Sequence, residues 1–268
     1  MLFDEKTFAT YVVYDGSPPP AAVDISLRLP IEGIPTILDV IEGRKTAAAG
    51  YRRDAEATVY VLVLVGSVCG IALYLHLVGV YSDPWSALRF AAFNVVSIAT
   101  TTGYANVDYN AWPIFAPLWM LFLCSFVSCS GSTGSGMKMI RAQILFKQIF
   151  RELLRIIHPR LQRPVKLSGL VIENRIVLAV LAYVFVYVSC IILSTLLLAA
   201  TGLDVLTAFS AAVASINNTG PGLGQVGPAS NYAVLGEFQI WVCSFLMLLG
   251  RLELMTLLVV MTPAFWRK

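Results

Sequence analysis

The sequence predicts an all-α integral membrane protein in which a unit of two spanning helices and an intervening re-entrant loop occurs twice. Three observations support this fold class. Of the 268 residues, 57% are hydrophobic and only 13% are charged, whereas soluble domains carry about 25% charged residues. Several long stretches hold no charged residue at all. Two shorter apolar stretches each run into a Gly-containing turn, which gives the chain an internal repeat.

Four stretches are long enough to cross a bilayer, since a spanning helix needs about 20 apolar residues. The first three hold no Asp, Glu, Lys or Arg, and the fourth holds only Glu237, Arg251 and Glu253. The predicted spans are Ala57–Ser82, Tyr109–Met137, Ile176–Leu203 and Tyr232–Phe265.

Two shorter apolar stretches, Trp85–Ser97 and Val205–Ile216, lie between these spans. Each is too short to cross a bilayer. Each follows a helix-start signal, Asp83-Pro84 in the first case and Asp204 in the second. A half-crossing helix that ends in a polar turn is a re-entrant element, and such backbone survives at membrane depth only where protein or water surrounds it.

Charge predicts the orientation of these segments. Arg and Lys cluster before the first span, between the second and third spans and at the C-terminal end, whereas Asp83, Asp108 and Asp204 mark the opposite side. Positive charge accumulates on the cytoplasmic side of membrane proteins. We therefore expect both termini and the central segment to be cytoplasmic, with both re-entrant loops entering from outside beneath a thin ring of acids.

The central segment, residues 138–169, holds eight basic residues and one acid, Glu152. Apolar residues recur in it at helical spacing, which predicts an amphipathic helix that ends at Pro159. Such a helix can lie on the anionic inner leaflet or dock a cytosolic partner, and the pattern leaves both open. The basic residues predicted to contact a partner are Lys138, Arg141, Lys147, Arg151 and Arg155.

The two turns have the composition of cation-coordinating loops. A dehydrated monovalent cation needs oxygen ligands in place of its water shell, and inward-pointing backbone carbonyls supply them without net charge. Such backbone needs dihedral angles that Gly adopts easily. Two ordinary Gly turns are the alternative, but they would need no preceding half-helix. The predicted binding residues are Thr101, Thr102, Gly103, Tyr104, Asn218, Thr219 and Gly220.

The turns also carry a family resemblance. Phe93–Tyr104 resembles the third pore loop of the Trk/Ktr superfamily of bacterial potassium uptake proteins, and Asn217–Gly224 resembles the fourth. The resemblance extends from about Asp54 to the last residue and is closest to the Trk branch. It implies potassium as the transported ion, with one filter glycine in each repeat, Gly103 and Gly220.

A run of small residues, Ser128–Gly136, interrupts the second predicted span. Each Gly in a helix costs about 1 kcal/mol relative to Ala, although small residues also suit a close helix-packing face. The resemblance implies that this stretch is an intramembrane loop that gates the pore below the filter. Its predicted gate residues are Ser130, Gly131, Ser132, Thr133, Gly134, Ser135 and Gly136.

Arg251 lies deep in the last predicted span. A charge at the bilayer centre costs about 2.5 kcal/mol or more, so its side chain should face protein or water. The alternative is a buried structural ion pair, and Glu253 lies on a different helix face. The resemblance implies that Arg251 projects into the permeation path and acts with the gate.

The resemblance also implies a pore built from four loop-bearing repeats, of which this chain carries two. The missing half is either encoded elsewhere or lost, or a second copy supplies it in a homodimer. A non-conducting fragment that modulates a full-length pore is the second hypothesis. The predicted divisions are an N-terminal cytoplasmic segment (1–50), a first repeat (51–137), a basic segment (138–169) and a second repeat (170–268).

The remaining expectations concern location, partners and chemistry. The resemblance places the chain in a bacterial inner membrane, beside a cytosolic nucleotide-binding ring that regulates the pore and that the basic segment could contact. No Gly-x-Ser-x-Gly elbow or phosphate-binding Gly loop occurs in the sequence. We therefore expect no enzymatic activity, no cofactor and no nucleic-acid partner.

Overall fold

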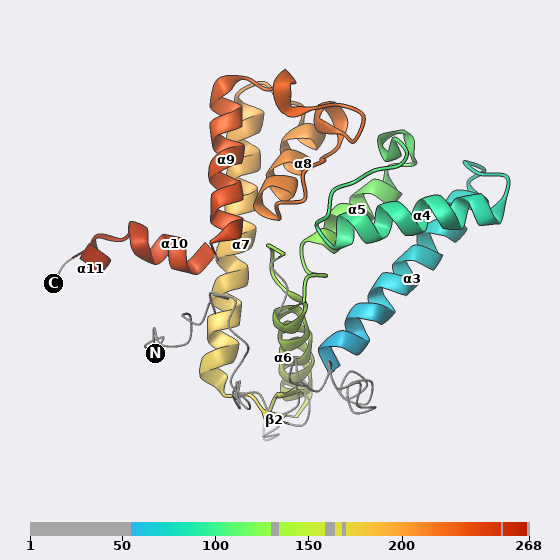
Figure 1. The fold of residues 1–268 in the computed structure, drawn as a ribbon. Coiled ribbons are helices and arrows are strands. Elements are labelled where there is room, and N and C mark those ends of the chain that lie inside the picture. The colour runs from blue at the N-terminus through green and yellow to red at the C-terminus, as the bar shows by residue number, and fades with distance from the viewer. Residues whose placement is uncertain (1–54, 130–133, 159–163, 168–169, 253, 267–268) are drawn as a thin grey trace, which may run out of the picture. The chain divides into compact units, whose positions relative to one another are not determined.

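The computed structural model describes residues 55–129, 134–158, 164–167, 170–252 and 254–266, all within the unit Ala48–Lys268. The predicted N-terminal segment, residues 1–50, lies outside these ranges. Figure 1 shows the described elements, which are almost entirely helical. The first repeat comprises α3 (Ala55–Leu77), α4 (Pro84–Ala99), the 3₁₀ turn η2 (Tyr109–Ala111) and α5 (Phe115–Cys124).

The central segment forms α6 (Met139–Ile157), followed by an antiparallel pair of two-residue strands, β1 (Lys166–Leu167) and β2 (Leu170–Val171). This confirms the predicted amphipathic helix, which ends just before Pro159. The second repeat comprises α7 (Asn174–Ala200), α8 (Val205–Ile216), the turns η3 (Gly224–Val226) and η4 (Tyr232–Val234), and the helices α9 (Glu237–Arg251), α10 (Leu254–Met261) and α11 (Pro263–Trp266).

Among the described residues, α3 and α7 are the two single helices long and apolar enough to cross a membrane. They confirm the first and third predicted spans. Large apolar side chains on both helices are exposed, including Leu62 and Leu73 on α3 and Phe185 and Leu193 on α7. Such exposure suits helices that face lipid, where apolar side chains have no water to avoid.

The second predicted span is interrupted, as expected from its small residues, but the helix ends earlier than the glycines suggest. Helix α5 stops at Cys124, and α6 begins only at Met139. The carbonyls of Ser125 and Ser128 accept hydrogen bonds from the amides of Met137 and Met139, at 2.8 and 2.7 Å. The described residues that follow α5 and precede α6 are therefore hydrogen-bonded to each other, and these backbone groups are satisfied.

The last predicted span is not one straight helix. Helices α9 and α10 meet at an angle of 110°, and α10 runs away from the α7–α9 pair in Figure 1. The bend follows Gly250, whose backbone packs against the carbonyl of Ile216 at the end of α8. Hydropathy does not reveal such a break because the residues on both sides of it are mostly apolar.

Each repeat has its own apolar core. Ile71, Leu75, Ile98 and Leu123 are fully buried where α3, α4 and α5 meet. Leu198, Ile216, Leu246 and Leu249 are buried where α7, α8 and α9 meet. The two cores anchor the short helices α4 and α8, and these helices in turn position the turns that follow them.

Candidate functional site: two matched turns and the loop beneath them

The short helices α4 and α8 begin with aspartate caps. The Asp204 carboxylate accepts a hydrogen bond from the Leu206 amide. At the start of α4, the hydroxyl and the amide of Ser86 both donate to Asp83 at 2.9 Å, and these bonds lower the pKa of the Asp83 carboxyl below its ordinary value. The predicted start signals are therefore confirmed, and each cap fixes the entry of a helix that ends in a turn.

The two turns, Thr100–Tyr104 after α4 and Asn217–Pro221 after α8, are called here the first and second re-entrant loops. They share an unusual backbone signature, in which residues two apart adopt positive φ angles. Thr101 and Gly103 have φ values of 56° and 81°, and Asn218 and Gly220 have φ values of 53° and 100°. A non-Gly residue at positive φ is uncommon and marks a position where the surrounding structure imposes the conformation.

The hydrogen bonds of the two loops match as well, at a constant offset of 117 residues. In each loop, three successive amides donate back to the end of the preceding helix. The pairs are Thr100 to Val96, Thr101 to Ile98 and Thr102 to Ser97 in the first loop, and Asn217 to Val213, Asn218 to Ser215 and Thr219 to Ala214 in the second. The amides are thus satisfied by the helix, which turns the following carbonyls away from it.

Four of these carbonyls, on Thr101, Thr102, Asn218 and Thr219, accept no hydrogen bond from any residue in the described ranges. The carbonyl of Tyr104, in contrast, accepts a hydrogen bond. The Ser97 hydroxyl donates to the Tyr104 carbonyl at 2.6 Å, and the Tyr104 side chain is 73% exposed. Unsatisfied carbonyls of this kind need water or a cation as a partner.

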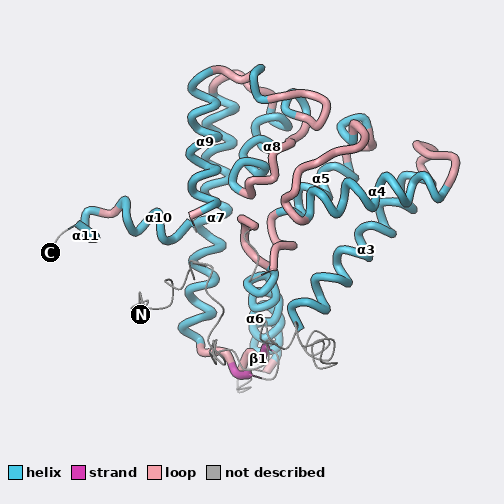
Figure 2. Tube along the Cα trace, viewed as in Figure 1, coloured by secondary structure: helices cyan, strands magenta, loops and turns pink. Residues whose placement is uncertain are grey.

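The two loops are in direct contact. A Cβ atom added to Gly103 would overlap the carbonyl oxygen of Thr219 and lie 3.2 Å from Cδ of Pro221. Figure 2 shows the loops after α4 and α8 approaching each other. The two repeats are also joined by Asn110, whose side chain accepts a hydrogen bond from the Gly224 amide and donates one to the Gly224 carbonyl. The fold therefore brings the two predicted sets of binding residues together.

The described part of the predicted gate, residues 134–136, lies directly beneath the second re-entrant loop. Ser130, Gly131, Ser132 and Thr133 are outside the described residues. Of the remainder, Ser135 is buried and its hydroxyl accepts a hydrogen bond from the Asn218 side chain at 2.9 Å. Gly136 has a φ of 97°, and a Cβ atom there would lie 2.5 Å from Oδ1 of Asn217.

Two tyrosines one turn apart on α7 hold this region, and hydropathy alone did not single them out. The Tyr183 hydroxyl donates to the Gly136 carbonyl, and the Tyr187 hydroxyl donates to Oδ1 of Asn217, both at 3.0 Å. Their i, i+4 spacing inside an uncharged span is a sequence signal, because buried tyrosines usually find a partner for the hydroxyl.

Arg251 is the last residue of α9 and follows the contact between Gly250 and Ile216. It therefore lies at the bend, below the second re-entrant loop, rather than within a continuous helix, and its side chain is exposed. Glu253, the nearby acid, lies outside the described residues.

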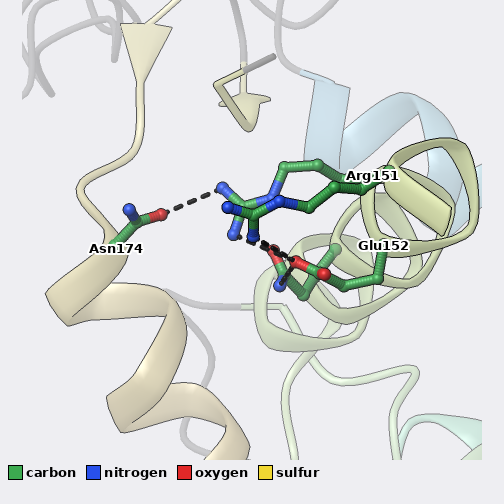
Figure 3. Close-up of polar contacts among 5 residues, drawn as sticks. Arg151, Glu152 and Asn174 are labelled. Carbon is green, nitrogen blue, oxygen red and sulfur yellow. Dashed lines mark hydrogen bonds and ion pairs between the residues drawn. The ribbon is translucent and has the colours of Figure 1, made fainter. Parts of the chain in front are cut away.

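The basic residues of α6 lie largely against the rest of the chain. Arg141 stacks over the ring of Tyr183 with 4.0 Å between guanidinium carbon and ring centroid, and the Lys147 ammonium donates to the Lys166 carbonyl. Figure 3 shows Arg151 donating to Asn174 of α7 at 2.9 Å while lying 3.6 Å from Glu152. Arg141 and Arg151 thus join α6 to α7, and Lys147 joins it to β1.

The other face of α6 is exposed and apolar. Its large exposed side chains recur at helical spacing: Phe146, Ile149, Phe150, Leu153, Ile156 and Ile157. Among the other residues predicted to contact a partner, the Arg155 side chain is 61% exposed, and Lys138 precedes α6 with a φ of 63°.

Comparison with known proteins identifies the family. The family model for TrkH, described as a cation transport protein, matches residues 58–268. The chain is 41% identical to the Trk system potassium uptake protein TrkH of Vibrio parahaemolyticus, over 81% of this chain and 44% of that protein. It is 38% identical to the TrkH protein of Halomonas elongata, over 97% of this chain and 54% of that protein.

The fold agrees with this similarity. The crystal structure of the potassium transporter TrkH from Vibrio parahaemolyticus superimposes with a TM-score of 0.80 and 37% sequence identity, covering 86% of this chain and 49% of that one. The chain thus spans about half the length of the relatives it matches. The resemblance drawn from the two loops is confirmed: this chain is an integral membrane protein that belongs to the TrkH family of cation transport proteins.

Proposed function

We propose that this chain is a pore-forming half of a potassium uptake system in a bacterial inner membrane. The contact between two matched turns, in which the carbonyls of Thr101, Thr102, Asn218 and Thr219 lack donors in the described ranges, supports this proposal most directly. Carbonyl oxygens replace the hydration shell of potassium without adding net charge. The proposed filter positions are Thr101, Thr102, Gly103 and Tyr104 with Asn218, Thr219 and Gly220.

Two loops surround an ion on only part of its circumference, so the proposed filter requires two more. A second copy in a twofold homodimer supplies them, since twofold pairing is the commonest symmetry of oligomers. A separate segment with two further repeats is the other source. The half-length match to the relatives favours one of these arrangements over a complete pore in a single copy.

Beneath the filter, we propose that the loop between α5 and α6 gates the path together with Arg251. The burial of Ser135 under the second re-entrant loop and the place of Arg251 at the α9–α10 bend support this role. A positive charge near the path raises the barrier to cations, and a loop that moves relative to it changes that barrier.

Helix α6 is proposed to lie at the cytoplasmic surface, on the same side as both termini. Its exposed apolar face suits the inner leaflet, and its basic residues remain the proposed contacts for a cytosolic nucleotide-binding ring: Lys138, Arg141, Lys147, Arg151 and Arg155. Arg141, Lys147 and Arg151 also hold α6 in place through contacts within the chain.

The proposed function is tested by potassium flux into liposomes that contain only this chain. We expect potassium entry above that of empty liposomes and a smaller sodium entry, because the carbonyl spacing of such a filter favours potassium. Absence of flux would contradict conduction by the chain alone. If the chain then changed flux through a co-reconstituted full-length TrkH, the modulatory alternative would replace the proposal.

A further inference from the structure

The two re-entrant loops match in their backbones but differ in their side chains at three positions, two of which directly follow the helices α4 and α8. The residues at the ends of α4 and α8 are Thr100 and Thr101 in the first loop and Asn217 and Asn218 in the second. The Thr100 hydroxyl makes hydrogen bonds only within its own loop and the preceding helix. Thr101 makes no side-chain hydrogen bond within the described part of the chain. Both asparagines instead reach residues of other elements.

Asn217 is completely buried and held on several sides. Its Nδ2 donates to the Val213 carbonyl at 2.9 Å and lies 3.5 Å from the Ser125 hydroxyl. Its Oδ1 accepts from the Tyr187 hydroxyl and faces Gly136, which has no room for a side chain there. The side chain of Asn217 is therefore held in one position at the start of the second re-entrant loop, in close contact with Gly136.

The side chain of Asn218 has hydrogen-bond partners different from those of Asn217. Its Nδ2 donates to the Ser135 hydroxyl at 2.9 Å and to the Met247 carbonyl of α9 at 3.1 Å. One side-chain amide thus joins the second re-entrant loop, the segment Gly134–Gly136 and the helix that ends in Arg251. A single neutral hydrogen bond is weak enough to break and re-form repeatedly.

We propose that Asn218 is a positioning residue whose side chain latches Gly134–Gly136 against the underside of the second re-entrant loop, so that this segment moves only when the Asn218–Ser135 hydrogen bond breaks. The inference deepens the proposed function by naming the contact that couples the filter to the segment beneath it. In the first repeat, Thr101 at the matching position makes no such contact with any described residue, so among these residues the latch is a feature of the second repeat.

Amide hydrogen exchange of the full chain in lipid nanodiscs tests the latch. In Ser135→Ala, which removes only the acceptor, we expect the amides of Gly134–Met139 to exchange about fivefold faster, as loss of one buried hydrogen bond predicts. Ser67→Ala is the matched control. Ser67 is also buried and also loses one hydrogen bond, from Trp119 at 3.1 Å, but it lies on α3.

A second variant tests whether faster exchange in Ser135→Ala comes from loss of this hydrogen bond or from a general loss of stability. Asn218→Gly removes the donor at a position whose positive φ glycine accepts, and it should accelerate the same amides. The double variant should exchange no faster than Asn218→Gly alone, because Asn218→Gly already removes the Asn218–Ser135 bond that Ser135→Ala removes. Equal exchange of Gly134–Met139 in Ser135→Ala and Ser67→Ala, or additive effects in the double variant, would overturn the latch.

The exchange measurement does not depend on conduction, so the two proposals can fail separately. Faster exchange in Ser135→Ala without any flux in the wild-type chain would support the latch and contradict conduction by the chain alone. Flux in the wild-type chain that Ser135→Ala leaves unchanged, with unchanged exchange, would support conduction and contradict the latch.

Discussion

Gly103→Ala is expected to reduce potassium flux to the level of empty liposomes. The added Cβ would overlap the Thr219 carbonyl oxygen, which is backbone and cannot rotate away. The φ of 81° adds strain of about 1 kcal/mol for an L-residue, and forced overpacking costs about 1–3 kcal/mol. The two re-entrant loops must therefore separate or distort, which removes carbonyls from the shared site. Flux in liposomes and the thermal unfolding midpoint measure the two consequences.

Gly79→Ala is the matched control for this variant. Gly79 has nearly the same φ, 80°, but nothing lies within 4 Å of an added Cβ atom. It therefore incurs the backbone strain without the overlap, and flux should remain near that of the wild-type chain. Equal loss of flux in both variants would show that strain alone, rather than contact between the loops, explains the effect.

Gly250→Ala should destabilise the chain by about 1–3 kcal/mol, although Ala favours helices over Gly by about 1 kcal/mol. The added Cβ would overlap the carbonyl oxygen of Ile216 and lie 3.0 Å from Nδ2 of Asn218. Helix α9 would have to move away from α8, and the bend before α10 would move with it. Thermal unfolding in nanodiscs measures the loss of stability.

The glycines of α3 provide the comparison. Gly66 and Gly70 are also helical, and nothing lies within 4 Å of a Cβ atom at either position. Gly66→Ala and Gly70→Ala should leave stability unchanged or raise it by up to about 1 kcal/mol. A Gly250→Ala variant as stable as these two would mean that α9 does not pack on the end of α8 as described.

Sequence reasoning succeeded where the determining property is local. The long uncharged stretches became α3 and α7, and the alternation of apolar and basic residues became α6. The re-entrant helices followed from their length and their aspartate caps. Gly103 and Gly220 of the two loops were found because a positive φ limits the choice of residue.

Features set by contacts between distant residues could not be read from the chain. Neither the bend between α9 and α10 nor the contact between Gly250 and Ile216 was predicted. The roles of Tyr183 and Tyr187 depend on the return of the α5–α6 loop beneath α8. Charge located a basic helix correctly, but it could not tell that Arg151 would contact Asn174 instead of remaining open to a partner.

The central claim is that the carbonyls of Thr102 and Thr219 bind potassium, and carbonyl chemical shifts test it most directly. The sequence holds four Thr-Gly pairs, at residues 102–103, 133–134, 201–202 and 219–220. Labelling Thr carbonyl carbon and Gly nitrogen therefore selects four carbonyls in solid-state NMR spectra. Thr201 at the end of α7 serves as an internal reference remote from the loops.

Replacing sodium by potassium in the sample should shift the Thr102 and Thr219 carbonyl signals together, with one midpoint, while the Thr201 signal stays fixed. Coordinated movement is required because both carbonyls would bind the same ion. Signals from Thr102 and Thr219 that do not respond to potassium, or that respond with different midpoints, would contradict a shared filter formed by the two re-entrant loops.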